Sequence, residues 1–376
     1  MNRRWCLAFA LAGALGGCAP FEAVDGGGGR RATASNETIE TPPDTPAPRP
    51  ESCDVQDTKL QALVTAMRES PNALVVVKNP SCGTTTYLAG GATTADEGSL
   101  WRVTGITETY VAATVLSLAA EGKLSLEDPL SKFVPNLPKT GGITVRMLLN
   151  HTSGIYSYRD DPAYKAARGV QWSPHTLVQL ATAHSPRFSP GKSFGVSETN
   201  YVLLGIIAEQ VSGKRIGELV RARAFAPAGL KATFFDGEEV VAGRRARAFD
   251  DDDDDVTDKE HPSGVWAAGA IVATGADMCA WAEKLWGTTA VLAAPTQGQL
   301  TLSPVSTGRG TTWGLGVEIG SDAVGTSLSH TGEGPGVATK VAYWPGRRTA
   351  IFAAVNQEDV RVEPLFDAAR AALFAQ

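Results

Sequence analysis

The sequence predicts an α+β domain in which a central antiparallel sheet, flanked by helices, joins the two ends of the chain. Three observations support this prediction: short strand-like runs near both ends, helical periodicity beside them, and turn residues between neighbouring runs. The predicted strands are the runs 73–79, 340–344 and 350–355. Because helical sequence separates the strands at the two ends, we expect sheet and helices to segregate within one domain.

Two helices are predicted next to these strands, over residues 55–69 and 362–374, where apolar residues recur at helical spacing. The first strand is followed by Pro80 and Gly83, and Pro345-Gly346 separates the other two strands. These residues favour tight turns, so the strands are expected to pair as antiparallel hairpins.

A further helix is predicted from Gly105 to about residue 120. Apolar or small side chains, such as Val111, Val115 and Leu118, surround it on nearly every side, which marks a helix buried in the core. Gly105 is expected to cap its beginning. Glu108 would then occupy the third helical position, where a carboxylate caps backbone N–H groups and suits the helix dipole.

This helix carries a family resemblance. The sequence Arg-Val-Thr-Gly-Ile-Thr-Glu-Thr-Tyr at 102–110 and the turn Gly-Lys-Leu-Ser-Leu-Glu-Asp-Pro at 122–129 resemble the nucleophile helix of the β-lactamase-related serine hydrolases. That family includes class C β-lactamases, D-Ala-D-Ala carboxypeptidases and related esterases. Its helix begins Ser-x-x-Lys, with serine as nucleophile and lysine as its base partner, because residues three apart share one helix face. In this chain Gly105 and Glu108 occupy those two places, so the resemblance implies a hydrolase scaffold without its nucleophile and base.

Two more motifs of the family follow in order. Residues 194–205 resemble its Tyr-Ser-Asn-x-x-Tyr-x-Leu-Leu-Gly motif, with Val196 in place of the acid–base tyrosine and Glu198 in place of asparagine. Ser197 is retained, and we interpret it as a helix cap. Ser-His-Thr-Gly at 329–332 resembles the (Lys/His)-(Thr/Ser)-Gly edge strand of the family pocket.

The resemblance implies a pocket formed by Ser197, His330, Thr331 and Gly332. His330 stands where a lysine would hold a ligand carboxylate more strongly, which favours the esterase-like branch. His151, in a His-Thr-Ser-Gly run, is expected to bind nearby backbone rather than to catalyse. The resemblance runs from about Leu60 to the C-terminus. It implies a β-lactamase/DD-peptidase-like fold, with a mostly helical subdomain from about residue 120 to 270 and the pocket at its junction with the sheet.

The beginning of the chain predicts export. Arg3 and Arg4 precede the apolar run 5–15, which is too short to span a membrane. Leu-Gly-Gly-Cys at 15–18 resembles a bacterial lipobox, so residues 1–17 are predicted to be a lipoprotein signal peptide. Cys18 would then carry lipid and anchor the protein in the cell envelope; the alternative is an ordinary secretory signal. Residues 18–52, rich in glycine and proline, are predicted to be a tether, and residues 53–376 the folded domain.

Cys53 and Cys82 are predicted to form a disulfide. A helix over 55–69 advances about 22 Å, and a strand over 73–79 returns about 23 Å. The chain therefore comes back near Cys53 where Cys82 is reached, and an exported protein meets an oxidising compartment. Cys279, in an apolar helical stretch, is left as a free thiol.

The formal net charge is −6, a value matched by the six consecutive aspartates 250–255 alone. The rest of the chain is balanced, so it lacks the basic surface of a nucleic-acid-binding protein. The aspartate run is interpreted as a solvated loop. A weak calcium site is the alternative, although the spacing of a calcium-binding loop is absent. We expect no cofactor and a monomer.

These observations favour an envelope-anchored serine hydrolase homologue that is catalytically inactive. Its remnant pocket would bind a cell-wall peptide, a β-lactam-like molecule or another small ligand. One alternative is an active β-lactamase, carboxypeptidase or esterase with a displaced nucleophile, Ser99 or Ser197, although neither is followed three residues later by lysine. A second alternative joins Glu108, Glu198 and His330 as metal ligands or as an acid of raised pKa with an ionised base. A third is a scaffold for envelope contacts.

Overall fold

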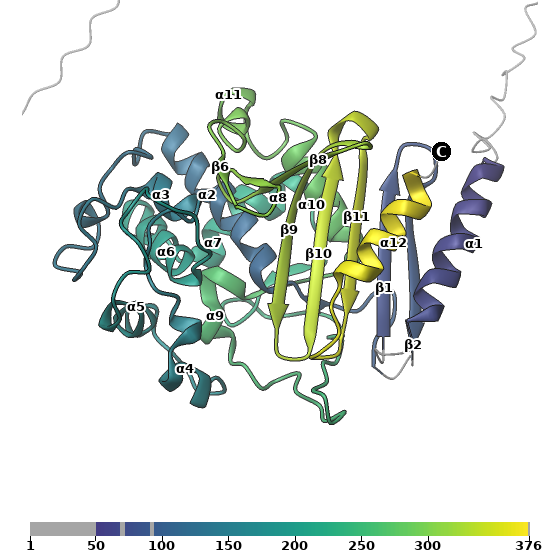
Figure 1. The fold of residues 1–376 in the computed structure, drawn as a ribbon, viewed down its shortest axis with the longest axis horizontal. Helices are drawn as coiled ribbons and strands as arrows, with labels where there is room; N and C mark the ends of the chain where they lie inside the picture. The colour runs from purple at the N-terminus through teal and green to yellow at the C-terminus, as the bar shows by residue number, and fades with distance from the viewer. Residues whose placement is uncertain (1–49, 68–71, 91–93, 375–376) are drawn as a thin grey trace, which may run out of the picture. The chain divides into compact units, whose positions relative to one another are not determined.

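The computed structural model describes residues 50–67, 72–90 and 94–374, and its central feature is an eight-stranded antiparallel sheet (Figure 1). The strand order is β2-β1-β11-β10-β9-β8-β7-β6. The strands are β1 (Asn72–Asn79), β2 (Gly83–Gly90), β6 (Val305–Ser306), β7 (Thr312–Trp313), β8 (Glu318–Asp322), β9 (Gly325–Gly334), β10 (Val337–Trp344) and β11 (Thr349–Val355).

The sheet joins the two ends of the chain, as predicted. Strand β1 pairs with β11 in the register Val75↔Ala353, so residues nearly three hundred positions apart share one ladder. Two hairpins flank this junction, β1–β2 and β10–β11, and their turns lie at the predicted proline and glycine positions. The prediction of an antiparallel central sheet is confirmed.

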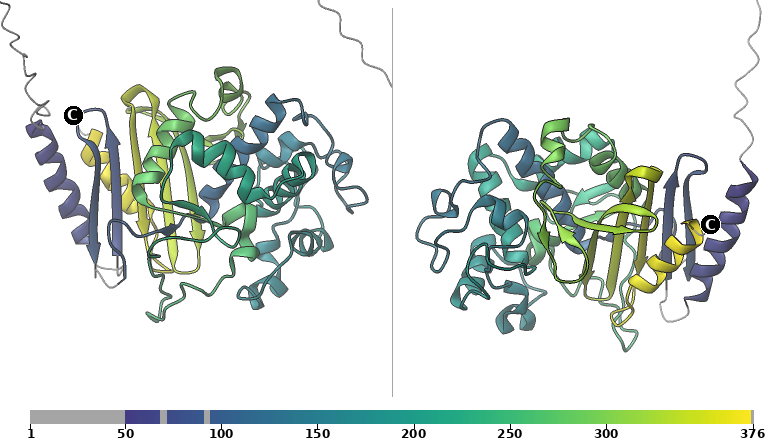
Figure 2. Two further views of the ribbon diagram at one scale, coloured as in Figure 1. Left: turned by 180° about the vertical axis from the view of Figure 1, so that it is seen from behind. Right: turned by 45° about the horizontal axis from the view of Figure 1, so that its top comes forward.

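Helices cover both faces of the sheet, because side chains along a strand alternate between the faces and each face buries apolar residues. Leu74 and Val76 point into a core shared with α2 (Thr107–Ala120) and α10 (Gly275–Trp286). Val75 and Val77 point into a second core, shared with α1 (Glu51–Ala66) and α12 (Glu363–Phe374). Figures 1 and 2 show α1 and α12 on one face of the sheet and α10 on the other.

The first and last helices differ slightly from their predicted bounds. Helix α1 begins at Glu51 rather than at residue 55, because Pro50 precedes it and the acidic Glu51 and Asp54 suit the positive end of a helix. It ends at Ala66, before residue 69, so the last predicted residues are not helical or lie outside the described ranges. Helix α12 begins at Glu363, one residue after its predicted start.

Most of the remaining helices gather in a subdomain beside the sheet, as the resemblance implied. They are α3 (Val145–Leu149), α4 (Pro162–Ala166), α5 (Pro174–Ala183), α6 (Glu198–Ser212), α7 (Ile216–Val220), α8 (Ala226–Ala228) and α9 (Pro262–Gly269). A small sheet in the order β3-β5-β4 joins strands from before, within and after this stretch, with β3 at Trp101–Arg102, β4 at Thr233–Phe235 and β5 at Ile271–Ala273. The short helix α11 (Ala294–Gly298) follows α10.

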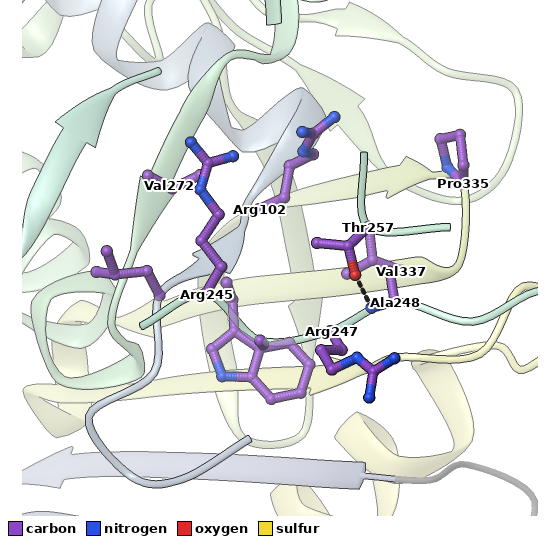
Figure 3. A pocket seen from close by; sticks show the side chains of 11 residues that line it. Arg102, Arg245, Arg247, Ala248, Thr257, Val272, Pro335 and Val337 are labelled. Atoms are coloured by element: carbon purple, nitrogen blue, oxygen red, sulfur yellow. Dashed lines mark hydrogen bonds between the residues drawn. The ribbon is translucent and has the colours of Figure 1, made fainter. Parts of the chain in front are cut away.

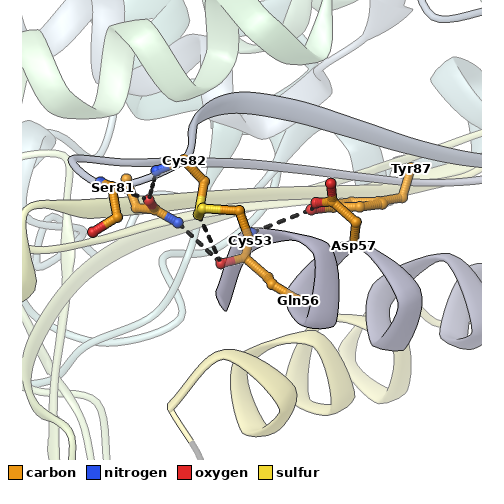
Figure 4. The surroundings of a disulfide bond; sticks show 7 residues. Cys53, Gln56, Asp57, Ser81, Cys82 and Tyr87 are labelled. Carbon is orange, nitrogen blue, oxygen red and sulfur yellow. Dashed lines mark hydrogen bonds between the residues drawn. A yellow bond between two sulfur atoms is a disulfide. The ribbon is translucent and has the colours of Figure 1, made fainter. Parts of the chain in front are cut away.

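The predicted disulfide between Cys53 and Cys82 is present and ties α1 to the β1–β2 turn (Figure 4). Polar contacts extend this link: the amide of Asn79 donates to Gln56 (3.1 Å), and the Tyr87 hydroxyl donates to Asp57 (2.5 Å). Burial, together with this bond to Asp57, raises the pKa of Tyr87 to about 12. Cys279 is buried and unbridged.

The predicted signal peptide, the lipidated Cys18 and nearly all of the tether lie outside the described residues. Within the described ranges, no helix has both the length and the apolar character needed to cross a bilayer.

Candidate functional site

The three motif segments meet at one cleft of about 390 Å³. Gly105 and Glu108 come from the beginning of α2, Val196 and Glu198 from the beginning of α6, and His330 and Thr331 from β9. The other lining residues are Arg159, Phe194, Ala268, Thr307, Arg309, Trp313, Glu318, Glu333, Lys340 and Glu363. The structure therefore brings residues from all three motifs together at one cleft, between the sheet and the helical subdomain.

Two of the four predicted pocket residues, Ser197 and Gly332, do not line the cleft. Ser197 occupies the predicted N-cap position of α6, but its hydroxyl makes no capping hydrogen bond and is buried without a partner. Gly332 packs against the turn before α2, where an added Cβ would collide with Thr104 Oγ1 and the carbonyl oxygen of Val103. Ser197 and Gly332 therefore lie behind the residues that line the cleft.

Strand β9 presents a free edge to the cleft. Its pairing with β8 ends at Ser329, whereas its pairing with β10 continues to Gly334. Residues 330–334 are therefore paired on one side only, and His330, Thr331 and Glu333 are among the residues that line the cleft.

Gly105 is tightly confined by this edge. It lies in a 3-10 turn (Thr104–Ile106) directly before α2. A Cβ built on Gly105 would lie 2.9 Å from the carbonyl oxygen of Thr331, closer than side-chain carbons approach a backbone oxygen in folded proteins. The space that a nucleophilic side chain would need is thus taken by backbone, so the loss of serine at this position has structural consequences beyond the lost hydroxyl.

Glu108 lies at the floor of the cleft and is 2% exposed. The prediction that it caps its helix is wrong: α2 begins at Thr107 and no side chain caps it. Instead the carboxylate reaches two histidines. Its Oε2 atom lies 3.1 Å from His151 Nε2 and 3.4 Å from His330 Nε2.

The hydrogen bonds of His151 fix its tautomer. Its Nδ1 atom accepts from the backbone N–H of Ser197 (3.3 Å) and from the side-chain amide of Asn200 (3.1 Å). Because an accepting nitrogen carries no proton, the ring proton sits on Nε2 and is donated to Glu108. The predicted contact of His151 with backbone is confirmed, whereas its bond to Glu108 was missed.

His330 completes the cluster. Its Nδ1–H donates to the carbonyl oxygen of Thr331 (2.9 Å), which leaves Nε2 facing Glu108 Oε2. At 3.4 Å the two atoms are within ion-pair distance, but His330 Nε2 is buried without a hydrogen-bond partner. Burial raises the pKa of Glu108, but the nearby His151 and His330 outweigh it and hold this pKa below its ordinary value. Glu108 is therefore not the acid of raised pKa in the predicted acid–base pair.

The predicted metal-ligand set is not assembled either. Glu198 accepts a hydrogen bond from Ser157 (2.5 Å) and has no contact with the histidine cluster. In the part of the chain that the structure describes, no group of three histidine, cysteine or acidic side chains is arranged to hold a metal ion.

The two proposed displaced nucleophiles also lie outside the cleft lining. Ser99 is fully buried and donates its hydroxyl to Asp96 (2.8 Å). The lysine of the lining, Lys340, lies on β10 with its ammonium 5.0 Å from the centre of the Phe366 ring. Neither Ser99 nor Ser197 therefore joins a base in the manner of the family.

A second cavity, shown in Figure 3, is unsuited to a substrate. It measures about 20 Å³, close to the space of one water molecule, although three arginines border it. Arg245 is bound at both ends of its fork to Asp236 (2.7 Å each), and Arg247 is paired with Asp255 (2.5 Å). These two arginines of the small cavity therefore form ion pairs within the protein.

Comparisons with known proteins agree with the family resemblance of the sequence motifs. A family model described as Beta-lactamase matches residues 60–376. Penicillin-binding protein 4* of Bacillus subtilis (strain 168) is 25% identical over 305 residues, which cover 74% of this chain and 66% of that protein. A putative D-alanyl-D-alanine carboxypeptidase of Escherichia coli (strain K12) is 29% identical over 154 residues, 38% of this chain and 35% of that protein. The alignments thus span about two thirds and one third of these relatives.

A solved structure extends the likeness to the whole fold. The D-stereospecific amidohydrolase from Streptomyces sp. superposes with a TM-score of 0.76 at 27% identity. The match covers 85% of this chain and 98% of that one. The predicted β-lactamase/DD-peptidase-like fold is confirmed.

Proposed function

Since the chain belongs to the β-lactamase family, whose model it matches from residue 60 to 376, we propose that it is a pseudoenzyme of this family. It does not perform acyl transfer and uses the cleft to bind a ligand. The observation that carries the proposal is the close approach of the Thr331 carbonyl oxygen to Gly105, which fills the place of a nucleophile with backbone.

The other catalytic positions support the same conclusion. Val196 has no proton to transfer, and Glu108 supplies an acid where the family has an amine. The two histidines that contact Glu108 Oε2 favour its ionised form, so this residue is committed to an internal ion and hydrogen-bond cluster. Loss of the nucleophile alone lowers turnover by roughly a millionfold in a serine protease, and this chain lacks three of the family's reacting groups.

The cleft itself remains suited to a small molecule. Its volume of about 390 Å³ lies within the usual range of ligand pockets, about 300–1,000 Å³. Phe194 and Trp313 supply apolar wall, and the free edge of β9 supplies backbone groups. A cell-wall peptide, a β-lactam-like molecule or a similar small ligand fits these features. The names of the relatives, a penicillin-binding protein and a putative carboxypeptidase, support this ligand class.

The proposal includes the location of the protein. The signal sequence and Cys18 support export and a lipid anchor in the bacterial cell envelope, with the domain held at the membrane surface as a monomer.

The test of inactivity is covalent labelling. Purified protein is treated with an active-site-directed fluorophosphonate and with a fluorescent penicillin, beside an active serine hydrolase as positive control. We expect no labelling and no hydrolysis of a chromogenic cephalosporin or a p-nitrophenyl ester. Stem peptides or β-lactams that bind the cleft should raise the melting temperature, because a ligand stabilises the state that binds it. Hydrolysis by the wild type that disappears in His330→Ala would overturn the proposal.

A further inference from the structure

The two carboxylate oxygens of Glu108 differ in their contacts: Oε2 lies beside the two histidines, and Oε1 is the free oxygen. Its Oε2 atom accepts a hydrogen bond from His151 and lies 3.4 Å from His330 Nε2, whereas Oε1 receives no hydrogen bond from any described residue. The side chain is 98% removed from solvent, yet it lines the cleft. An ionised carboxylate has about four acceptor sites, and leaving a buried one partly unused is unfavourable. The free oxygen is not among the fully buried atoms without a partner, so it is reachable from the cleft and can accept a hydrogen bond from a donor there.

A second acceptor borders the same space. The carbonyl oxygen of Thr331 lies beside Gly105, and both residues line the cleft floor with Glu108. The floor thus offers a carboxylate oxygen and a carbonyl oxygen. A ligand group that donates several hydrogen bonds and carries positive charge matches it, whereas an anionic group would be repelled.

The walls next to the floor suit a cation as well. Phe194 and Trp313 lie with ring centres 5.5 Å apart, and both line the cleft. Aromatic rings attract ammonium groups and pack against the carbon stem that carries them. Three residues of the same lining are themselves cationic. Arg159 is paired with buried Glu260 (3.2 Å), and the Lys340 ammonium lies over the Phe366 ring. The third, Arg309, comes from the loop between β6 and β7.

We infer that the floor of the cleft is an amine-recognition site. Glu108 Oε1 and the Thr331 carbonyl oxygen accept hydrogen bonds from a primary ammonium group, and its carbon stem packs against Phe194 and Trp313. This inference rests on the proposed function, because it uses Glu108 to bind a ligand in a cleft that does not perform acyl transfer. It narrows the ligand class to amino esters, amino amides and peptides with an accessible primary amine.

Three probes that share a phenyl ring and differ in the charge of its substituent test the inference. Benzylammonium, benzyl alcohol and benzoate are titrated into the purified full-length protein by isothermal calorimetry at one pH and ionic strength. We expect benzylammonium to bind at least about tenfold more tightly than benzyl alcohol, the usual effect of a charge-assisted hydrogen bond, and benzoate to bind more weakly still. Equal or tighter binding of the neutral or anionic probe, or no saturable binding of benzylammonium, would overturn the inference.

The variant Glu108→Gln keeps the shape of the side chain and removes its charge. It should weaken the binding of benzylammonium about tenfold or more and leave the affinity for benzyl alcohol unchanged. Glu218→Gln, at an exposed position on α7, is the matched control and should bind as the wild type does. Circular dichroism verifies folding. If Glu108→Gln does not fold, the wild-type probe series still decides, because it needs no variant.

Failure of this inference is distinguishable from failure of the proposed function. Fluorophosphonate labelling would overturn the proposed function whatever the amine result. An unlabelled protein without preference for benzylammonium would overturn the amine site alone.

Discussion

Residue 105 shows how one substitution can become fixed by its surroundings. In the structure the Thr331 carbonyl oxygen of β9 approaches Gly105 so closely that a side chain has no room. Interiors are packed densely enough that such a contact is relieved only by moving backbone. Restoring a serine would therefore disturb the strand edge as well as add an oxygen.

Gly105→Ser is expected to lower the free energy of unfolding by roughly 1–3 kcal/mol, the usual effect of overpacking. It should not produce hydrolysis, because Glu108 and Val196 remain. Urea unfolding followed by fluorescence measures the first effect, and a chromogenic ester assay the second.

Gly141→Ser is the control, since nothing lies within 4 Å of a Cβ at that position and its φ is not positive. It should change stability by less than about 0.5 kcal/mol. A Gly105→Ser protein as stable as this control would show that β9 yields easily at Gly105.

At the scale of elements, α1 is held to the sheet by a covalent link and by one apolar face. Leu60 and Val64 pack on the sheet with α12, while Cys53 is bonded to Cys82 at the β1–β2 turn. The link closes a loop across 29 positions of sequence, so it restricts the unfolded chain substantially.

Removal of this disulfide in the double variant Cys53→Ser/Cys82→Ser should lower the free energy of unfolding by about 3 kcal/mol, within the range of about 2–4 usual for native disulfides. Chemical denaturation of the oxidised wild type and of the variant measures the difference.

The wild type under reducing conditions serves as the control and should match the double variant. In the oxidised, denatured wild type, Cys279 should be the single reactive thiol among residues 50–374. Equal stability of oxidised protein and variant would contradict the predicted role of the link.

At the scale of the whole molecule, the sheet closes the ends of the chain onto one another through β1 and β11. The site lies at β9, which β11 and β10 separate from β1 in the strand order, where β9 loses its partner β8 after Ser329. The described domain begins with α1, which packs on the same sheet.

We predict that Cys18→Ser moves the protein from the membrane fraction to the soluble fraction of cells that express it, because each buried methylene of a lipid contributes about 0.8 kcal/mol to membrane binding. Fractionation and immunoblotting measure the distribution. Cys6→Ser, within the predicted signal peptide, should leave the protein at the membrane. The same membrane content for Cys18→Ser and wild type would refute the lipid anchor.

Much of the fold was predictable from sequence because its signals are local. The strand runs, the turn residues at Pro80, Gly83 and Pro345, and the all-round apolar surface of α2 each depend on a few neighbouring residues. The motif positions located the cleft in the same way, because the register of each motif fixes which residue occupies each place.

The chemistry of the cleft was decided by tertiary packing. The sequence alone established that Gly105, Glu108 and Val196 replace the family's reacting groups, and it suggested a helix cap for Glu108. The structure instead joins Glu108 to His151, 43 positions away, and to His330, on a distant strand. No local pattern encodes such a pairing. Both the direction of a buried carboxylate and the approach of the Thr331 carbonyl to Gly105 follow from how β9 packs against α2, which depends on the whole core.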